Sequence, residues 1–228
     1  MPPLRLAHRG DWRRAPENTL AAFRAALDVP GCDGFELDVR LAADGTPVVV
    51  HDDTLARVQG RPERVDALPA AVLGEAGVPT LAEVFAAIPQ RAFVDVELKV
   101  DAGTAVIEVL AAARGAQLRG VALSSFDPAT LDGIRRRAPA WPCWLIAADL
   151  GPETIRTAAE LGCVAVAAGW RSIDRGSVAR AASHGLDVAA WTVRRRPTFE
   201  RLARLGVLAV CVEGAALDGD GHGREEER

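Results

Sequence analysis

Short apolar runs alternate with amphipathic stretches along most of this chain, and no other feature of the sequence restricts the fold as strongly. The runs are typical of β-strands and cover residues 4–8, 34–39, 46–51, 92–100, 120–126, 143–147, 163–168, 187–193 and 207–212. Between most of them, apolar residues recur at helical spacing. In residues 18–28, for example, Leu20 and Phe23 share one face, and Asn18 is the expected N-cap. Strands that alternate with helices predict a parallel sheet with helical crossovers.

A closed barrel is the economical arrangement of these strands. About eight strand–helix units fall within residues 1–215, and we expect them to form one (β/α)8 barrel of the TIM type in a single domain. An open doubly wound sheet is the alternative, but neither a Gly-x-Gly-x-x-Gly turn nor a P-loop follows the first strand. No Pro-, Gly- or Ser-rich linker divides the chain, and residues 216–228 are expected to be a disordered tail.

One connection is too short for a crossover helix. The segment between Val39 and Thr46 contains Asp44-Gly45, a dipeptide typical of two-residue hairpin turns. A β-hairpin over about residues 34–51 is therefore expected in place of one crossover. With Asp44-Gly45 as the turn, Asp38 would lie opposite His51, whereas a shift of the register by one residue would remove this pairing.

Acidic residues occupy one face of two predicted strands. Glu36 and Asp38 alternate with apolar residues in the first, and Asp95 and Glu97 do so in the second, followed by Lys99. Because buried carboxylates are costly unless paired or bound to a metal, the two strands predict a shared polar site at the carboxyl-terminal mouth of the barrel. The alternative is a structural polar layer in which buried arginines satisfy the carboxylates.

Three of these carboxylates suit a hard divalent cation such as Mg²⁺ or Ca²⁺ better than zinc, because no Cys or His cluster with ligand spacing lies nearby. Asp95 lies deeper in its strand and is expected to be structural.

Two histidines end predicted strands close to the acidic residues. His8 and His51 are the types of side chain that serve as general acid and general base near neutral pH. A lone histidine at a strand end is usually structural, and two near one carboxylate cluster favour catalysis. Of the other two histidines, His184 is expected to end a helix, and His222 lies in the expected tail.

Three segments together carry a resemblance to a known family. They are "LAHRGDWRRAPENTLAAFRAAL", "GFELDVRLAADGTPVVVHDDTLARV" and "VDVELK". Their His-Arg-Gly, Pro-Glu-Asn-Thr, Glu-x-Asp-Val, His-Asp and Glu-x-Lys elements closely resemble those of the glycerophosphodiester phosphodiesterases, which are phospholipase C-like, distorted (β/α)8 barrels. "SSF" at 124–126 and "WTV" at 191–193 extend the resemblance through the second half of the chain.

The resemblance implies an activity and a set of roles. The implied reaction is the metal-dependent hydrolysis of a glycerophosphodiester, or of a lysophospholipid relative, to sn-glycerol 3-phosphate and an alcohol. The implied roles are an acid–base pair (His8 and His51), three ligands of one divalent cation, Mg²⁺ or Ca²⁺ (Glu36, Asp38 and Glu97), and two phosphodiester contacts (Arg9 and Lys99). Trp191 is a candidate for stacking on the substrate, or alternatively a core aromatic residue. Which histidine is the acid, and whether water or the substrate's own 2-hydroxyl attacks, stay open.

The sequence departs from the family pattern at two positions of the expected barrel mouth. Arg194 follows "WTV" where the family often has Asn, and Glu213 lies near the position of a Thr-Asp-x-Pro-like segment. Both departures leave the predicted catalytic residues intact and leave the preference for the alcohol open.

Lys99 is the only lysine in the chain, against twenty-six arginines. A lone lysine at a barrel strand end also fits a Schiff-base aldolase, but such a lysine needs a depressed pKa. Glu97 on the same face would raise the pKa of Lys99 instead. A barrel that binds a phospho-ligand without turnover is a further alternative.

Composition restricts the classes of partner that the protein can bind. The net charge of −4 argues against nucleic-acid binding. No segment is typical of a signal peptide or a membrane span, and a cytoplasmic location is expected. The four cysteines form no CxxC pair and are expected to be reduced. The resemblance implies a small-molecule glycerophosphodiester as the partner. No stable membrane insertion is expected, and the oligomeric state is not predicted.

Overall fold

All nine expected strands form in the computed structural model, which describes residues 2–219. They are β1 Leu4–His8, β2 Gly34–Leu41, β3 Pro47–Val49, β4 Phe93–Leu98, β5 Val121–Ser125, β6 Cys143–Ala147, β7 Ala165–Gly169, β8 Asp187–Val193 and β9 Ala209–Val212. Eight of them pair in parallel in the order β1-β2-β4-β5-β6-β7-β8-β9, and β9 returns to pair with β1. The predicted closed (β/α)8 barrel is therefore confirmed.

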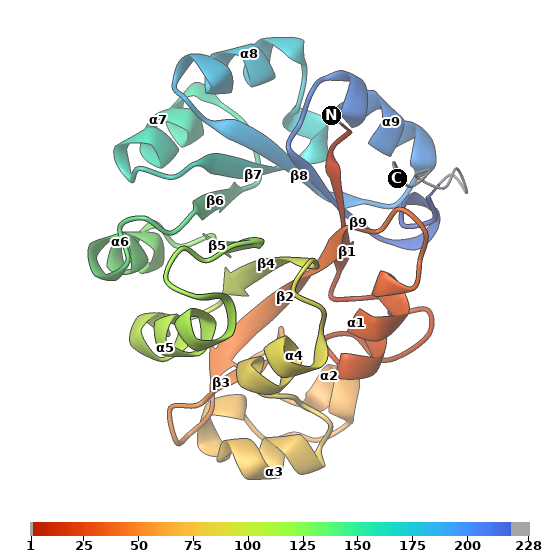
Figure 1. Ribbon diagram of the computed structural model, residues 1–228, viewed down its shortest axis with the longest axis vertical. Coiled ribbons are helices and arrows are strands. Elements are labelled where there is room, and N and C mark those ends of the chain that lie inside the picture. The colour runs from red at the N-terminus through yellow and green to blue at the C-terminus, as the bar shows by residue number, and fades with distance from the viewer. Residues whose placement is uncertain (1, 220–228) are drawn as a thin grey trace.

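Helices surround the barrel in the described part of the chain (Figure 1). They are α1 Leu20–Leu27, α2 Ala56–Gln59, α3 Ala70–Glu75, α4 Leu81–Ala87, α5 Gly103–Arg114, α6 Pro128–Arg137, α7 Pro152–Glu160, α8 Arg175–Ser183 and α9 Arg196–Arg204, with short 3₁₀ turns at η1 Val65–Ala67, η2 Trp170–Ser172 and η3 Gly214–Ala216. Helices α2 and α3 lie with β3 at one end of the molecule, far from α8 and α9 (Figure 1). No helix among residues 2–219 is long and apolar enough to cross a lipid bilayer.

The extra strand β3 pairs antiparallel with β2, with a register that differs by one residue from the prediction. Val39 lies opposite Val49, and the N–H of Val50 donates to the carbonyl of Asp38. His51 therefore does not face Asp38 across the hairpin. The reason is a three-residue loop, residues 43–45, in which Gly45 adopts a positive φ of 80° after the turn, in place of the expected two-residue turn.

Two apolar layers hold the barrel together. The larger layer packs one face of the strands, including Phe35, Leu37 and Val96, against the helices. The smaller layer fills the barrel interior, where Trp144 and Ile146 meet alanines of β7, β8 and β9. Because alanine side chains are short, the interior beside these strands has room for a cavity at the carboxyl ends.

Two local expectations need correction. Helix α1 is capped by Thr19, whose hydroxyl accepts a hydrogen bond from the N–H of Ala22, and not by Asn18. The positive φ of 58° at Asn18 turns this residue out of the capping position. At the other end, Ala216 and Leu217 are buried, so the expected tail does not begin before 218. Residues 220–228 lie outside the described part.

Candidate active site

The acidic residues of β2 and β4 lie side by side inside the barrel mouth. The two strands pair in register, which places Glu36 beside Asp95 and Asp38 beside Glu97. His8, at the end of β1, pairs with Glu36 on the other side. The period of two in the sequence therefore brings both acidic faces to one place, as expected, with the apolar neighbours against the helices.

Three carboxylates form a compact cluster. Glu36, Asp38 and Glu97 are buried, and each offers an oxygen within 4.8 Å of the others'. Burial, with repulsion from neighbouring acids, raises the pKa of Glu36 well above its usual value, and the same causes raise the pKa of Glu97. For Asp38, burial acts in the same direction but the charges of Lys99 and Arg9 outweigh it and lower the pKa.

This cluster fits a divalent cation. Glu36 Oε1 is buried and has no hydrogen-bond partner among the described residues. Asp38 Oδ1 likewise lacks one, although Lys99 Nζ lies 3.0 Å away as an ion-pair partner. A cation bound between these oxygens would favour the ionised form of all three carboxyls, which their burial opposes. Cys211 also lies close to Glu36 and His8, but burial raises its thiol pKa well above the usual value, which disfavours it as a thiolate ligand.

Lys99 lies at the edge of the cluster. Its Nζ is 3.0 Å from Asp38 Oδ1 and donates a short hydrogen bond to Glu97 Oε1. Burial lowers the pKa of Lys99, but the two carboxylates outweigh it and the net shift is upward. The ammonium is therefore charged, which is opposite to what a Schiff-base nucleophile requires.

Arg9 contacts the cluster from a strained backbone conformation. Its φ is +56°, its N–H donates to Glu36 Oε2 at 3.1 Å, and its Nε lies 3.1 Å from Asp38 Oδ2. The next residue, Gly10, also has a positive φ, and a Cβ there would meet the backbone of Ala22 at 2.7 Å. The His-Arg-Gly element thus bends the chain sharply between β1 and the segment that leads to α1.

Asn18 belongs to the site, which the sequence reasoning missed. Its side-chain amide donates to Asp38 Oδ2 at 2.7 Å and the residue is buried. The available signal was its place in the Pro-Glu-Asn-Thr element, because asparagine tolerates the left-handed backbone conformation that a helix N-cap does not use.

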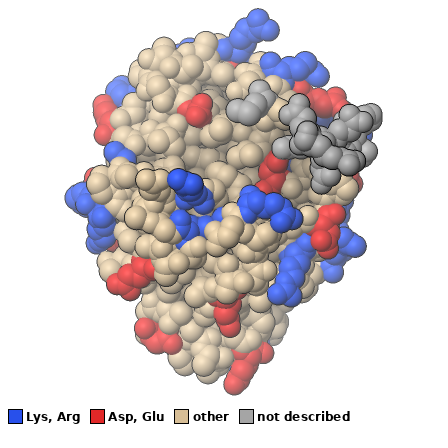
Figure 2. All heavy atoms as spheres, in the orientation of Figure 1, with Lys and Arg blue, Asp and Glu red and all other residues tan. Residues whose placement is uncertain are grey.

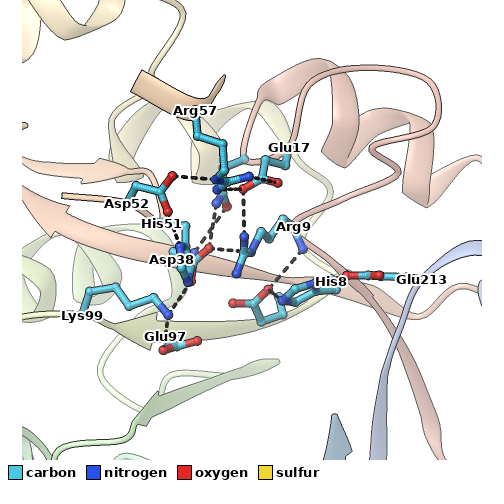
Figure 3. Close-up of polar contacts among 12 residues, drawn as sticks. His8, Arg9, Glu17, Asp38, His51, Asp52, Arg57, Glu97, Lys99 and Glu213 are labelled. Carbon is cyan, nitrogen blue, oxygen red and sulfur yellow. Dashed lines mark hydrogen bonds and ion pairs between the residues drawn. The ribbon is translucent and has the colours of Figure 1, made fainter. Parts of the chain in front are cut away.

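His51 is held by a chain of ion pairs that reaches Arg9. Its Nδ1 lies 2.6 Å from Asp52 Oδ1, and Asp52 pairs through its other oxygen with Arg57 Nε, also at 2.6 Å. Arg57 in turn pairs with Glu17, which pairs with Arg9 (Figure 3). The Arg57 hydrogen bond, more than opposing burial, lowers the pKa of Asp52 to about 2. Of these partners, Glu17 and Asp52 lie within the named elements, whereas Arg57 lies in the quoted segment that ends at Val58 but in none of its named elements.

His8 has a carboxylate partner from the opposite end of the chain. Its Nδ1 lies 2.5 Å from Glu213 Oε1, and its Nε2 is 3.9 Å from Glu36 Oε2. Arg194 Nε donates to Glu213 Oε2 at 2.7 Å. Burial raises the pKa of Glu213, but the hydrogen bonds from His8 and Arg194 outweigh it and lower the pKa to about 2.

Several of these groups line one cavity of about 230 Å³. Its polar side contains the two histidines, Arg9, Lys99 and the acids Glu36, Asp95 and Glu97, and its apolar side contains Phe126, Trp144, Ile146 and Trp191. The Trp191 ring is fixed, because its Nε1 donates to the carbonyl of Ala167 at 2.9 Å and Phe126 packs edge-on against it.

The remaining polar candidates are not part of the three-carboxylate cluster. Asp95 is buried and accepts a hydrogen bond from Ser124 at 2.6 Å, and burial raises its pKa to about 7. His184 is the C-cap residue of α8 and does not line the cavity. His222 lies outside the described residues.

Comparisons with known proteins show the family of this chain. Residues 8–215 match the glycerophosphoryl diester phosphodiesterase family. A glycerophosphodiester phosphodiesterase of Caldanaerobacter subterraneus subsp. tengcongensis is 31% identical over 93% of this chain and 95% of its own length.

Solved structures show the same fold. An Oleispira antarctica phosphodiesterase, solved in complex with the product sn-glycerol-3-phosphate, is 27% identical with a TM-score of 0.83 over 92% of this chain and 93% of its own. A Thermotoga maritima glycerophosphodiester phosphodiesterase, 24% identical, shares the fold with a TM-score of 0.79 over 95% and 96% of the two chains. From the family match over nearly the whole barrel and the full-length relative, this chain belongs to the glycerophosphodiester phosphodiesterase family of phosphoric diester hydrolases.

Proposed function

We propose that this chain hydrolyses glycerophosphodiesters to sn-glycerol 3-phosphate and an alcohol, with a divalent cation and two histidines. One observation carries the proposal. Two histidines, each with its Nδ1 against a carboxylate, line the same cavity as Glu36 and Glu97, which belong to a cluster of three buried carboxylates. The product seen in the Oleispira antarctica relative supports the same substrate class.

Glu36, Asp38 and Glu97 would hold the cation. An all-carboxylate donor set favours Mg²⁺ or Ca²⁺ over softer metals. When bound there, such a cation supplies Lewis-acid polarisation of the phosphoryl group and lowers the pKa of a hydroxyl.

Lys99 and Arg9 would bind the non-bridging phosphate oxygens. Both cations lie against the cluster, and Lys99 lines the cavity with its ammonium charged. Their charges would offset the negative charge that the phosphoryl group brings next to three carboxylates and would orient the diester for attack.

The histidines would move the protons. Asp52 and Glu213 accept from the Nδ1 side, which leaves Nε2 of each ring for the substrate and stabilises the imidazolium when it forms. One histidine accepts the proton of the attacking hydroxyl, and the other donates a proton to the departing alkoxide.

The test is a turnover assay on glycerophosphocholine, glycerophosphoethanolamine and glycerophosphoglycerol with Mg²⁺ or Ca²⁺, scored by release of glycerol 3-phosphate. We expect EDTA to abolish turnover, and His8→Ala and His51→Ala each to lose at least about 10²-fold in kcat. His184→Ala is the matched control, since this histidine lies outside the cavity, and should keep wild-type turnover. Turnover that survives EDTA or the His8 substitution would contradict the mechanism. No turnover of any diester would favour a barrel that only binds its ligand.

A further inference from the structure

A second hollow lies beside the catalytic cavity and is rich in arginine. It has a volume of about 640 Å³ and lies at the carboxyl ends of β6, β7 and β8. Its lining includes Arg171, Arg194 and Arg195 with Trp170 and Thr198, and none of its lining residues is acidic. We call it the arginine groove.

The arginine groove adjoins the catalytic cavity. Trp191 and Thr192 line both hollows. Because Trp191 is fixed by its bond to Ala167, it forms a rigid boundary between them. A diester whose phosphorus lies among Lys99 and the two histidines has two arms, and an arm that passes Trp191 enters the groove.

The groove arginines keep hydrogen-bond donors free for a ligand. Arg171 Cζ lies over the Trp170 ring, 4.3 Å from its centroid, and the Arg171 side chain has no hydrogen bond or ion pair within residues 2–219. Arg194 uses Nε for Glu213, and neither of its Nη atoms has a partner within residues 2–219. Arg195 is exposed, and its side chain has no hydrogen bond or ion pair in that range, although its carbonyl accepts from the N–H of Thr198 at the start of α9.

Three other arginines differ from Arg171 and Arg195. Arg9, Arg13 and Arg57 are each paired with carboxylates. The whole molecule has a net charge of −4, and basic and acidic side chains are interspersed over the face in Figure 2. The positive charge of the groove is therefore local. Arg171 and Arg195 have no carboxylate partner within residues 2–219, and such guanidinium groups favour phosphate or carboxylate ligands that they can bind in a bidentate manner.

We propose that the arginine groove binds an anionic group on the alcohol arm of the substrate. The preferred substrates are then glycerophosphodiesters whose alcohol carries a second phosphate. This inference rests on the proposed function and deepens it, because it assigns the alcohol preference that the family pattern left open at Arg194.

A matched pair of substrates tests the proposal. One is glycerophosphoglycerol, and the other is the same diester with a phosphate monoester on its terminal hydroxyl. The variant is Arg171→Gln/Arg195→Gln, which spares Arg194 because that residue holds Glu213. The control variant is Arg91→Gln/Arg119→Gln, which removes the same charge from exposed positions next to the amino ends of β4 and β5.

We expect the groove variant to lose at least about 10-fold in kcat/KM on the phosphorylated diester, since each arginine contributes a charge-assisted hydrogen bond. On glycerophosphoglycerol it should stay within about 2-fold of wild type, and the control should match wild type on both substrates. Wild-type discrimination between the two substrates should weaken at high ionic strength.

Other outcomes overturn the proposal. Equal losses on both substrates would assign the arginines a structural role, and unchanged values on both would show that the groove does not bind the substrate. If the groove variant loses binding to vesicles of anionic phospholipid while both kcat/KM values stay unchanged, the groove faces a membrane instead. If the wild-type protein turns over neither diester, the proposed function itself fails, whereas turnover without discrimination overturns this inference alone.

Discussion

At the scale of single residues, the site depends on a few side chains whose partners hold them in position. Each candidate histidine has a carboxylate against its Nδ1, and the other oxygen of each carboxylate pairs with an arginine. Arg57 pairs with Asp52, and Arg194 pairs with Glu213. The same pattern arises from different segments and different spacings. We therefore interpret Glu213, which departs from the family pattern, as a positioning residue for His8.

Lys99 is the residue whose chemical type is most open to test. Its compact ammonium contacts Asp38 and Glu97 at the edge of the cluster, a position that a wide planar guanidinium does not reproduce. We expect Lys99→Arg to lose at least about 10²-fold in kcat/KM, because the change keeps the charge but displaces it from the phosphate. Steady-state kinetics measure the loss, and thermal unfolding should show a folded protein with a Tm close to wild type.

Lys99→Met is the comparison for this prediction, because it removes the charge and keeps the approximate length. Both variants should be impaired if shape and charge are needed together. Near-wild-type turnover in Lys99→Arg would mean that any cation suffices and that the lone lysine is incidental.

At the scale of elements, two tight turns bring the site together. The His-Arg-Gly bend brings Arg9 against the carboxylates. The hairpin loop 43–45 sets the register of β3, and the register of β3 in turn sets the position of His51, which follows that strand. Both turns use a glycine with φ near 80°, namely Gly10 at 83° and Gly45 at 80°.

These two glycines form a matched pair for measuring what the bend contributes. A Cβ at Gly45 would meet nothing within 4 Å, whereas one at Gly10 would clash with the backbone of Ala22 in α1. We expect Gly45→Ala to lower the free energy of unfolding by about 1 kcal/mol, from backbone strain alone. Gly10→Ala should lose clearly more, and should lose activity as well, because Arg9 and His8 shift with the bend. Urea unfolding and turnover measure both; equal costs in the two variants would show that contact with α1 does not matter.

At the scale of the whole molecule, the barrel encloses three carboxylates whose negative charges repel one another. The pKa values of Glu36 and Glu97 are raised in the fold by burial and by the neighbouring acids. Their protonated forms therefore contribute stability below about pH 4.3, the ordinary value for glutamate, and this contribution is lost as the pH rises through the raised values.

Divalent cations should reverse this loss. Because the cluster must be ionised to bind a cation, the rise in Tm caused by Mg²⁺ or Ca²⁺ should be larger at pH 8 than at pH 5. Differential scanning calorimetry with and without the cation measures this rise in Tm at each pH. Asp52 and Glu213 have lowered pKa values, so their effect on the pH dependence of stability has the opposite sign. That effect is the same with and without the cation and cancels when the two Tm values are subtracted. Glu36→Gln is the control: without cation it should raise the Tm by a few degrees, roughly 2–4 °C per kcal/mol, and it should weaken the response to the cation. A cation effect that does not change with pH would contradict the assignment of the cluster.

The sequence by itself determined the nine strands, the closed barrel and the residues that point inward, because strand period and strand–helix alternation are local properties that tertiary packing did not override. It also predicted roles for His8, His51, Glu36, Asp38, Glu97, Arg9 and Lys99, and the fold brings all seven to one mouth, where their roles stay predictions.

Only the tertiary structure decided the partners. Asn18 was expected to cap a helix and instead binds Asp38, because its backbone adopts a left-handed conformation that spacing alone does not reveal. Glu213 meets His8 across 205 positions of sequence because β9 closes the barrel against β1. The arginine groove likewise joins the ends of separate strands, and contacts of this kind are set by how the barrel closes, which no local pattern encodes.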